Sequence, residues 1–424
     1  MVYKKHDYGS YTLHTIKTDK FKLVHMEIIF RNNAQKENIT KRNILFDLLT
    51  DSNNEYKTKR DLTLKLEDLY SAYLYSVTSK VGNAHITSLC MDFINPKYTE
   101  KTALENSLRL PFEMIFNPLA VNREFDPKLV EMTKERALDN INAIKESPKK
   151  YALMEAIKTL GEDSPSSYSN VGFSEDIAAI TPASLYEYYE EVLNHDYIDI
   201  YIVGDLDMDK VDKIIAEEAK FDVIKNHDFK LYVQNNKRKP VIKSDKFVYI
   251  QTTIVTILNL NKLTSYEQKY VANLYNMILG GGSLETKLYK KLRGENSLCY
   301  NVGSMYQKYD GLIIITTSVD VNNEAKAIKL IKETIKDMTD KITDTELNQA
   351  GELIISSLKM NMDNIGKVVD NYFYKDISDL DDYETRITEF KKVTANEIYN
   401  LSKKVSISTI YSLVGDSKIW KSKK

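Results

Sequence analysis

The stretch KLRGENSLCYNVGSMYQKYDGLIIITTSV, which runs from Lys291 to Val319, decides the fold because an earlier part of the same chain resembles it. That earlier part, KLEDLYSAYLYSVTSKVGNAHITSLCMDF, begins at Lys65, so the two stretches lie 226 positions apart (291 − 65). Each reads as the end of a helix followed by two paired strands. The chain is therefore predicted to contain an internal duplication.

Two further pairs of segments recur in the same order. In ITPASLYEYYEEV and VTANEIYNLSKKV, Tyr186 and Tyr399 lie 213 positions apart (399 − 186), and each segment begins with a Thr suited to cap a helix. In IDIYIVGDLD and STIYSLVGDSK, Gly204 and Gly415 lie 211 positions apart (415 − 204), and each apolar strand ends in a Gly-Asp turn signal. Three matches in one order indicate two homologous halves.

The predicted fold class is α+β, with an antiparallel or mixed β-sheet packed against helices in each half. Residues 1–234 form the predicted first half and residues 247–424 the second, joined by a linker over residues 235–246, the charged stretch NNKRKPVIKSDK. A chain of 424 residues exceeds the roughly 250 to 300 residues at which one core stops growing. Strands show alternation, as at Val24, Met26, Ile28 and Phe30, and helices show three-to-four spacing, as at Ala327, Ile328, Ile331 and Ile335.

Composition and charge argue against several functional classes. Lys and Arg number 59 against 61 Asp and Glu, so no basic excess is present to bind nucleic acid or an anionic membrane. No run of about 18 apolar residues predicts a membrane span, and the first residues lack the apolar stretch of a secretory signal. The two cysteines, Cys90 and Cys299, are too few for a disulfide framework or a four-cysteine zinc site. We expect a cytoplasmic protein.

The segment GGGSLETKLYKKLRGENSLCY, Gly280 to Tyr300, contains a glycine turn, a helix ending in Leu-Arg, and a Tyr seven residues after that Arg. It is not a nucleotide-binding loop, because neither GxxxxGK[ST] nor GxGxxG is present. A purely structural interpretation stays open, in which Ser283 caps a helix, Arg293 is a solvated helix-terminal cation and Tyr300 packs on a neighbouring strand.

This segment resembles the second-half signature of the M16 peptidases, the pitrilysin and mitochondrial-processing-peptidase type. The resemblance implies an M16, LuxS/MPP-like metallohydrolase fold. It also implies that Arg293 and Tyr300 reach a zinc site elsewhere and help position the scissile carbonyl of a peptide. A guanidinium and a phenolic hydroxyl are hydrogen-bond donors that can stabilise the oxyanion formed when hydroxide attacks a peptide bond.

The zinc motif of active M16 members, H-x-x-E-H on a helix, has no counterpart in this chain. The matching region is ITKRNILFDLLTDS, residues 39–52, where Ile44, Asp47 and Leu48 stand in place of His, Glu and His. Apolar side chains cannot bind zinc, so this region is predicted to be an ordinary core helix. The family's third ligand is a Glu on a later helix, but without the histidines Glu131 and Glu135 are predicted to face solvent.

No metal ligand is predicted in this chain. The six histidines are scattered, with no pair at i, i+3 or i, i+4, and are predicted to be surface or satisfied structural residues: His6, His14, His25, His85, His195 and His227. Nor is there a nucleophile motif, because GxSxG is absent and Cys299 is predicted to be a small buried apolar residue.

The resemblance implies a non-catalytic subunit of a heterodimeric zinc metallopeptidase. Zinc is then expected in a homologous partner subunit that carries H-x-x-E-H, as in paired bacterial M16 proteins, and the isolated chain is expected to be inactive and able to self-associate as a homodimer. The alternative is a catalytically dead peptide-binding or scaffolding protein with the same fold. A stand-alone hydrolase with an unrecognised site is the least favoured interpretation.

Overall fold

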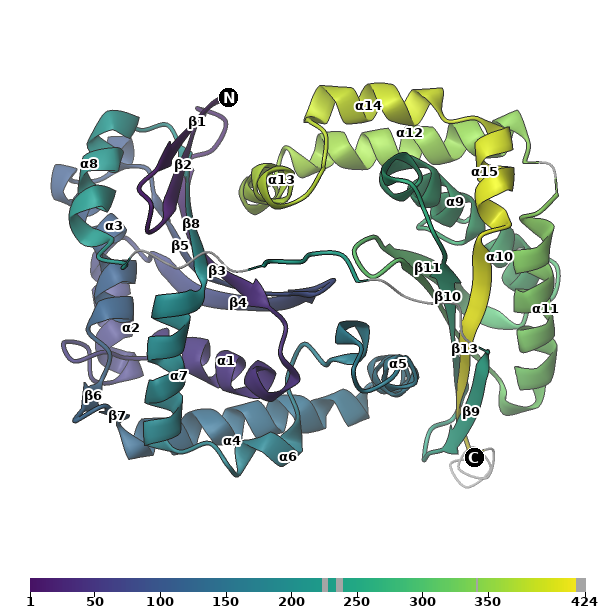
Figure 1. Ribbon diagram of the computed structural model, residues 1–424, viewed down its shortest axis with the longest axis horizontal. Helices are drawn as coiled ribbons and strands as arrows, with labels where there is room; N and C mark the ends of the chain where they lie inside the picture. Colours follow the sequence, from purple (N-terminus) through teal and green to yellow (C-terminus); the bar gives the residue numbers. More distant parts are fainter. Residues whose placement is uncertain (223–227, 234–238, 341, 417–424) are drawn as a thin grey trace. The chain divides into compact units, whose positions relative to one another are not determined.

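The computed structural model describes residues 1–222, 228–233, 239–340 and 342–416, and the chain divides into two compact units (Figure 1). Unit 1 comprises Met1–Asn142 with Ser169–Lys230, and unit 2 comprises Ala143–Tyr168 with Leu231–Lys424. Each unit has its own sheet and its own hydrophobic core.

Unit 1 is built around a six-stranded sheet. Its elements are β1 (Val2–Asp7), β2 (Thr12–Lys17), β3 (Leu23–Asn33), α1 (Lys36–Leu49), α2 (Lys59–Asp68), β4 (Tyr73–Val81), β5 (Ala84–Ile94), η1 (Pro96–Tyr98), α3 (Lys101–Phe116), β6 (Ala120–Val121), β7 (Glu124–Phe125), α4 (Pro127–Ala143), α6 (Ser174–Ile177), α7 (Pro182–His195), β8 (Tyr197–Gly204) and α8 (Met208–Glu218). The strand order is β1-β2-β8-β3-β5-β4, with β2 and β8 parallel and the other neighbours antiparallel. Helices α1, α3, α7 and α8 cover one face of this sheet (Figure 1).

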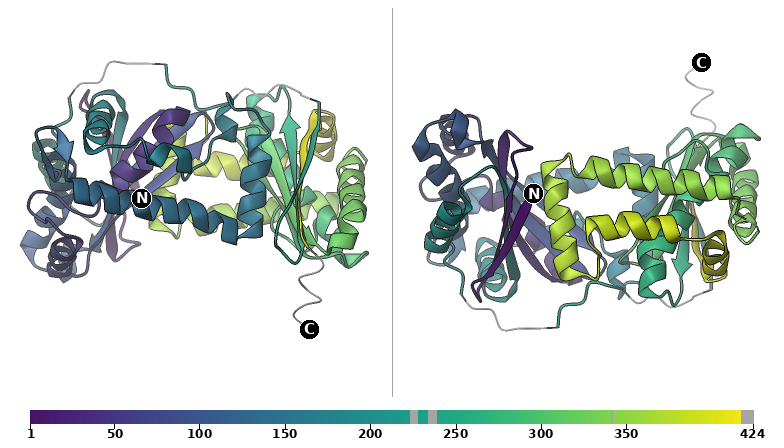
Figure 2. Two further views of the ribbon diagram at one scale, coloured as in Figure 1. Left: turned by 90° about the horizontal axis from the view of Figure 1, so that it is seen from below. Right: turned by 90° about the horizontal axis from the view of Figure 1, so that it is seen from above.

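Unit 2 is built around a five-stranded sheet. Its elements are η2 (Ile144–Glu146), α5 (Pro148–Lys158), η3 (Pro165–Ser167), β9 (Val241–Lys246), β10 (Thr252–Leu260), η4 (Glu267–Val271), α9 (Ala272–Leu279), α10 (Lys287–Tyr289), η5 (Lys290–Gly294), β11 (Cys299–Gln307), β12 (Leu312–Val319), η6 (Val321–Asn323), α11 (Glu324–Asp337), α12 (Asp344–Asn361), α13 (Ile365–Ile377), α14 (Tyr383–Lys392), α15 (Ala395–Ser402) and β13 (Val405–Val414). The strand order is β11-β12-β10-β13-β9, with β13 and β9 parallel. Helices α12 and α14 lie side by side (Figure 2).

The two sheets repeat one topology, which confirms the predicted α+β fold with two homologous halves. Without β1, the order β4-β5-β3-β8-β2 in unit 1 corresponds to β11-β12-β10-β13-β9 in unit 2, and the parallel pair comes last in both. The corresponding strands β4 and β11 begin at Tyr73 and Cys299, which are 226 positions apart (299 − 73), the offset of the first sequence match. Thr181 and Thr394 cap the corresponding helices α7 and α15 through their side chains, as predicted.

The division into units differs from the predicted ranges chiefly in the segment Ala143–Tyr168, which contains α5 and belongs to unit 2. Helix α5 lies within the predicted first half, but it packs in unit 2, where Ala152 and Ala156 contact Val255 and Ile257 of β10. The opposite face of that sheet packs on α9 through Ile254 and Leu258 of β10. The sequence pattern of α5 gives its apolar face but not which sheet that face covers.

The stretch predicted to be a linker is divided in the structure. Residues 235–238 lie outside the described residues, whereas Val241–Lys246 form β9, which pairs with β13 along six residues. β9 has two apolar residues followed by Lys, Ser, Asp and Lys, and most of it is exposed. This composition fits an exposed edge strand and is also that of a linker.

In the described part of the chain, none of the helices combines the length and the apolar character that crossing a bilayer requires.

Candidate functional site

Arg293 and Tyr300 lie together in unit 2. Arg293 belongs to η5, a π-helical turn, and Tyr300 follows Cys299 at the start of β11. The Arg293 guanidinium donates a hydrogen bond from Nη1 to the backbone carbonyl of Tyr300, and its Cζ lies 4.6 Å from the centre of the Tyr300 ring. The seven-residue spacing in the sequence therefore corresponds to direct contact.

The Tyr300 side chain faces solvent. The residue is 85% exposed, although its neighbour Cys299 is buried in the core. This exposure argues against the structural interpretation in which Tyr300 packs on a neighbouring strand. A π-helical turn widens the helix by one residue and often occurs at functional sites. The structure thus presents a guanidinium and a phenol side by side on an open face.

Close packing and backbone conformation explain the glycines in the turn that precedes this pair. A Cβ on Gly280 would lie 2.7 Å from Ser304 Oγ and 2.8 Å from Leu288 Cδ1, and the Gly280 carbonyl accepts a hydrogen bond from the Ser304 backbone N–H at 2.9 Å. Gly282 has φ of +87°, a left-handed conformation that favours glycine. These glycines bring the end of α9 against β11.

Helix α1 occupies the region where the resemblance implies a zinc motif, and it is a core helix, as predicted. Ile44 and Leu48 are completely buried, and both belong to the core of unit 1. Asp47 is the one polar residue of the three, and its Oδ1 accepts a hydrogen bond from Ser76 Oγ at 3.3 Å. Burial raises the pKa of the Asp47 carboxyl above its ordinary value, although the nearby Arg136 acts in the opposite direction.

The polar groups around Asp47 are already paired with protein cations. Asp51 receives a hydrogen bond from Arg136 Nη2 and lies 3.1 Å from Lys59 Nζ. The predicted solvent-facing positions of Glu131 and Glu135 on α4 are confirmed, while Arg136 on the same helix points to Asp51 instead. The half-buried Asp47 and the cation-paired Asp51, beside the apolar Ile44 and Leu48, do not fit a zinc ion, which needs three or four N, O or S ligands.

A cavity of about 560 Å³ lies beside these residues, between α1, α2, α4 and β4. Its lining includes Asp47, Arg136 and the β4 residues Tyr73 to Ser76. Since β4 is the last strand in the order of its sheet, one side of its backbone has no strand partner within the described residues. An edge strand next to a groove can accept an extended peptide as an additional strand.

The histidines divide into exposed and buried residues. His6 and His195 are exposed, whereas His14, His25 and His85 are buried, and His227 lies outside the described residues. His14 is satisfied, with Tyr3 OH 2.8 Å from Nδ1 and Asp199 Oδ1 3.3 Å from Nε2.

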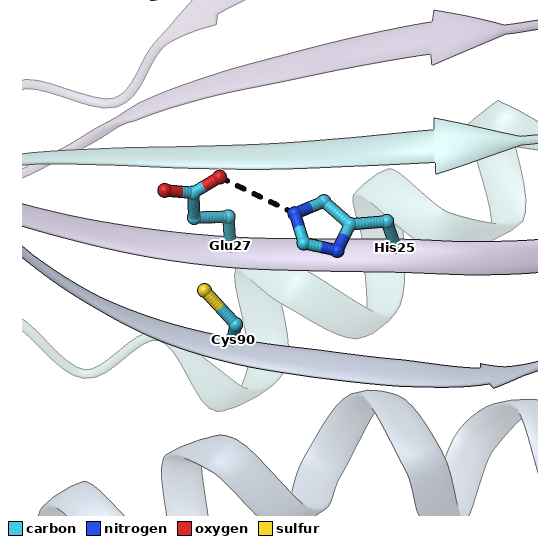
Figure 3. A group of neighbouring side chains, drawn as sticks. All are labelled: His25, Glu27 and Cys90. Carbon is cyan, nitrogen blue, oxygen red and sulfur yellow. Dashed lines mark hydrogen bonds and ion pairs between the residues drawn. The ribbon is translucent and has the colours of Figure 1, made fainter. Parts of the chain in front are cut away.

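His25 lies in a cluster that the sequence did not predict. Its ligand nitrogen, a carboxylate oxygen of Glu27 and Sγ of Cys90 all lie within 4.8 Å of one another (Figure 3). Burial alone would lower the pKa of His25, but hydrogen bonds to Asp92 and Glu27 raise it to about 9. In the sequence, the cluster is visible only as the two spacings His-x-Glu and Cys-x-Asp. The register of the strands brings these two pairs of residues together.

Comparisons with known proteins agree with this architecture. A family model described as the Peptidase M16 inactive domain matches residues 179–353. The probable inactive metalloprotease YmfF of Bacillus subtilis is 25% identical to this chain over 423 residues, which cover 97% of each protein. Among solved structures, a conserved protein from Enterococcus faecalis matches with a TM-score of 0.90 and 23% identity, over 98% of this chain and 99% of that one. A peptidase M16 inactive domain from Pseudomonas fluorescens matches over the same shares with a TM-score of 0.79 and 18% identity.

Proposed function

Because the chain belongs to the M16 peptidase family, as a homologue of its inactive type, we propose that it is the non-catalytic subunit of a heterodimeric zinc peptidase. The observation that carries this proposal is the pairing of Arg293 with an exposed Tyr300 in a chain whose α1 lacks zinc ligands. A surface arginine stacked on a surface tyrosine does little for the core of unit 2. Both groups are hydrogen-bond donors available to a molecule outside this chain.

The chemical role of the pair follows from the charge that develops during peptide hydrolysis. A homologous partner with an intact H-x-x-E-H helix would supply the zinc-bound hydroxide that attacks the peptide carbonyl. Arg293 then contributes a permanent positive charge and Tyr300 a phenolic O–H toward the oxyanion. The contact of the Arg293 guanidinium with the Tyr300 backbone and ring fixes the distance between the two donors before substrate binds.

Kinetics of the mixed subunits test this role. With the partner chain and a fluorogenic peptide, Tyr300→Phe and Arg293→Ala are each expected to lower kcat by about 100-fold or more, because loss of one oxyanion donor costs roughly 2.7 to 4 kcal/mol. The affinity of the two chains for each other is measured in parallel, since a lost interface would reduce activity by another route.

Two exposed residues of unit 1 serve as matched controls. Tyr98→Phe removes a hydroxyl from a residue that is 63% exposed, and Arg123→Ala removes a surface guanidinium from the turn between β6 and β7. Both variants are expected to keep wild-type kcat. Full activity in Tyr300→Phe and Arg293→Ala would contradict the proposal.

A second candidate function is a catalytically dead peptide-binding or scaffolding protein. The observation that favours it is the cavity beside the open edge of β4, which suits an extended peptide. This candidate predicts peptide binding by the isolated chain and no hydrolysis beside any homologous partner. Fluorescence anisotropy with an unstructured labelled peptide, together with the mixed-subunit assay, separates the two candidates.

A further inference from the structure

The cluster around His25 is formed by the register of two neighbouring strands in unit 1. In the antiparallel pair β3 and β5, His25 lies opposite Asp92 and Glu27 lies opposite Cys90. Successive side chains of a strand point to opposite faces, so these four share one face of the sheet. The residues of β3 that alternate with His25 and Glu27 are apolar. They point to the other face of the sheet, where they belong to the helix-covered core of unit 1.

The distances within the cluster are those of groups that converge on one point. His25 Nε2 lies 3.3 Å from Glu27 Oε2, and the sulfur of Cys90 completes a group whose ligand atoms are all within 4.8 Å (Figure 3). His25 and Cys90 are buried, and Glu27 is nearly so. The cluster thus combines three different types of metal ligand, an imidazole, a carboxylate and a thiol, in one largely buried group.

We propose that His25, Glu27 and Cys90 bind one zinc ion, with the fourth position left to water. The ligand set of one nitrogen, one oxygen and one sulfur suits Zn²⁺, which accepts all three and is commonly four-coordinate. Bond lengths of about 2.0 to 2.3 Å imply ligand separations of roughly 3.3 to 3.8 Å in a tetrahedral site. Separations of up to 4.8 Å between the ligand atoms therefore contract by roughly 1 to 1.5 Å at most on binding, which side-chain rotations can provide.

Asp92 has the position of the residue that orients a histidine ligand. Its Oδ1 lies 2.6 Å from His25 Nδ1, and its Oδ2 accepts a hydrogen bond from Tyr75 OH at 3.2 Å. A histidine that binds a metal through one ring nitrogen usually donates the other N–H to a carboxylate, which fixes its tautomer. Asp92 is thus a positioning residue that leaves Nε2 directed at the ion.

Charge and proton balance are consistent with this site. On binding, the Cys90 thiol and the Nε2–H of the His25 imidazolium each release a proton to solvent. Cys90 then coordinates as thiolate, Glu27 as carboxylate and His25 through neutral Nε2, while Nδ1 keeps its proton for Asp92. The two negative ligands balance Zn²⁺.

This site is separate from the proposed peptidase role. Its ligands lie on strands β3 and β5, whereas the missing zinc motif belongs to α1, and its test uses the isolated chain without any partner. The inference departs from the expectation that no histidine of this chain is a ligand. That expectation considered only pairs within one helix, and the ligands here come from two strands.

Cobalt(II) titration of the full-length, tag-free, reduced protein tests the proposal. Co²⁺ takes zinc sites and reports thiolate ligation by an intense near-ultraviolet charge-transfer band. We expect one Co²⁺ per chain, the thiolate band, its loss when one equivalent of Zn²⁺ is added, and an increase of several degrees in Tm with Zn²⁺.

Variants assign the ligands. Cys90→Ser should abolish the thiolate band, and the isosteric Glu27→Gln and His25→Asn should weaken Co²⁺ binding at least tenfold, with circular dichroism confirming that each variant folds. Cys299→Ser, which changes the buried cysteine of unit 2, should keep both the band and the stoichiometry. No band in the wild-type protein, a band that survives Cys90→Ser, or a band lost in Cys299→Ser would overturn the proposal.

Discussion

His85, near the start of β5, is a buried polar residue with one ring nitrogen that lacks a hydrogen-bond partner among the described residues. That nitrogen is Nε2, and the residue is 2% exposed. Burial, with a smaller contribution from the nearby Arg42 guanidinium, holds the pKa of His85 well below its ordinary value. His85 is therefore neutral in the folded chain, and the prediction of a satisfied structural histidine was wrong at this nitrogen.

The lowered pKa of His85 predicts a loss of stability in acid. The unfolded chain binds a proton at this residue below about pH 6.5, whereas the folded chain does so only at lower pH, so stability is present above pH 6.5 and falls as the pH decreases. Within this pH window, protonation of His85 in the unfolded chain lowers the free energy of unfolding by about 1.4 kcal/mol per pH unit.

Urea unfolding of wild type and His85→Leu, followed by circular dichroism at pH 7.5 and pH 5.5, measures this effect. Between pH 7.5 and pH 5.5, the free energy of unfolding of His85→Leu is expected to fall by about 1 kcal/mol less than that of wild type, because leucine binds no proton. An equal loss of stability in both proteins would show that His85 does not titrate in this range.

At the scale of elements, the glycine turn after α9 packs against β11, the strand that carries Tyr300. Gly280 has no room for a side chain beside Ser304 and Leu288, whereas Gly351 in α12 has no atom within 4 Å of an added Cβ. The two positions form a matched pair of Gly→Ala substitutions in the same unit.

Gly280→Ala is expected to destabilise unit 2 by about 1 to 3 kcal/mol, because the added methyl overpacks against β11. Gly351→Ala is expected to stabilise the chain by about 0.5 to 1 kcal/mol, because alanine favours an exposed helix over glycine. Thermal unfolding of both variants measures the difference, and a Tm for Gly280→Ala at or above that of wild type would contradict the close packing assigned to this turn.

Local elements could be predicted from the sequence, and their distant partners could not. Thr181 and Thr394 cap helices as predicted, because a cap depends on residues three positions apart. The attachment of α5 to β10 and the register of β3 with β5 depend on residues far apart in the chain. The duplicated segments were the exception, because the repetition itself shows that the two halves share one topology.

At the scale of the whole molecule, one topology appears twice, and the described residues of neither unit combine an H-x-x-E-H helix with a contacting Arg and Tyr pair such as Arg293 and Tyr300. Unit 1 carries Asp47 between Ile44 and Leu48 in α1, where the family resemblance implies a zinc motif, and unit 2 carries the contacting pair Arg293 and Tyr300. Such a division of parts is what a subunit that works only beside a zinc-bearing homologue requires. Arg293 and Tyr300 could be singled out only through the family resemblance, because their spacing alone is common, and their mutual contact was not predicted.

The most direct test is peptide hydrolysis by three samples: this chain alone, a homologous chain with an intact H-x-x-E-H helix alone, and an equimolar mixture. The partner is taken by co-purification from the native source, so that the pair tested is one that forms in the cell. We expect hydrolysis at least 100-fold faster in the mixture than in either chain alone. Equal rates in the mixture and in the zinc-bearing chain alone would contradict the account.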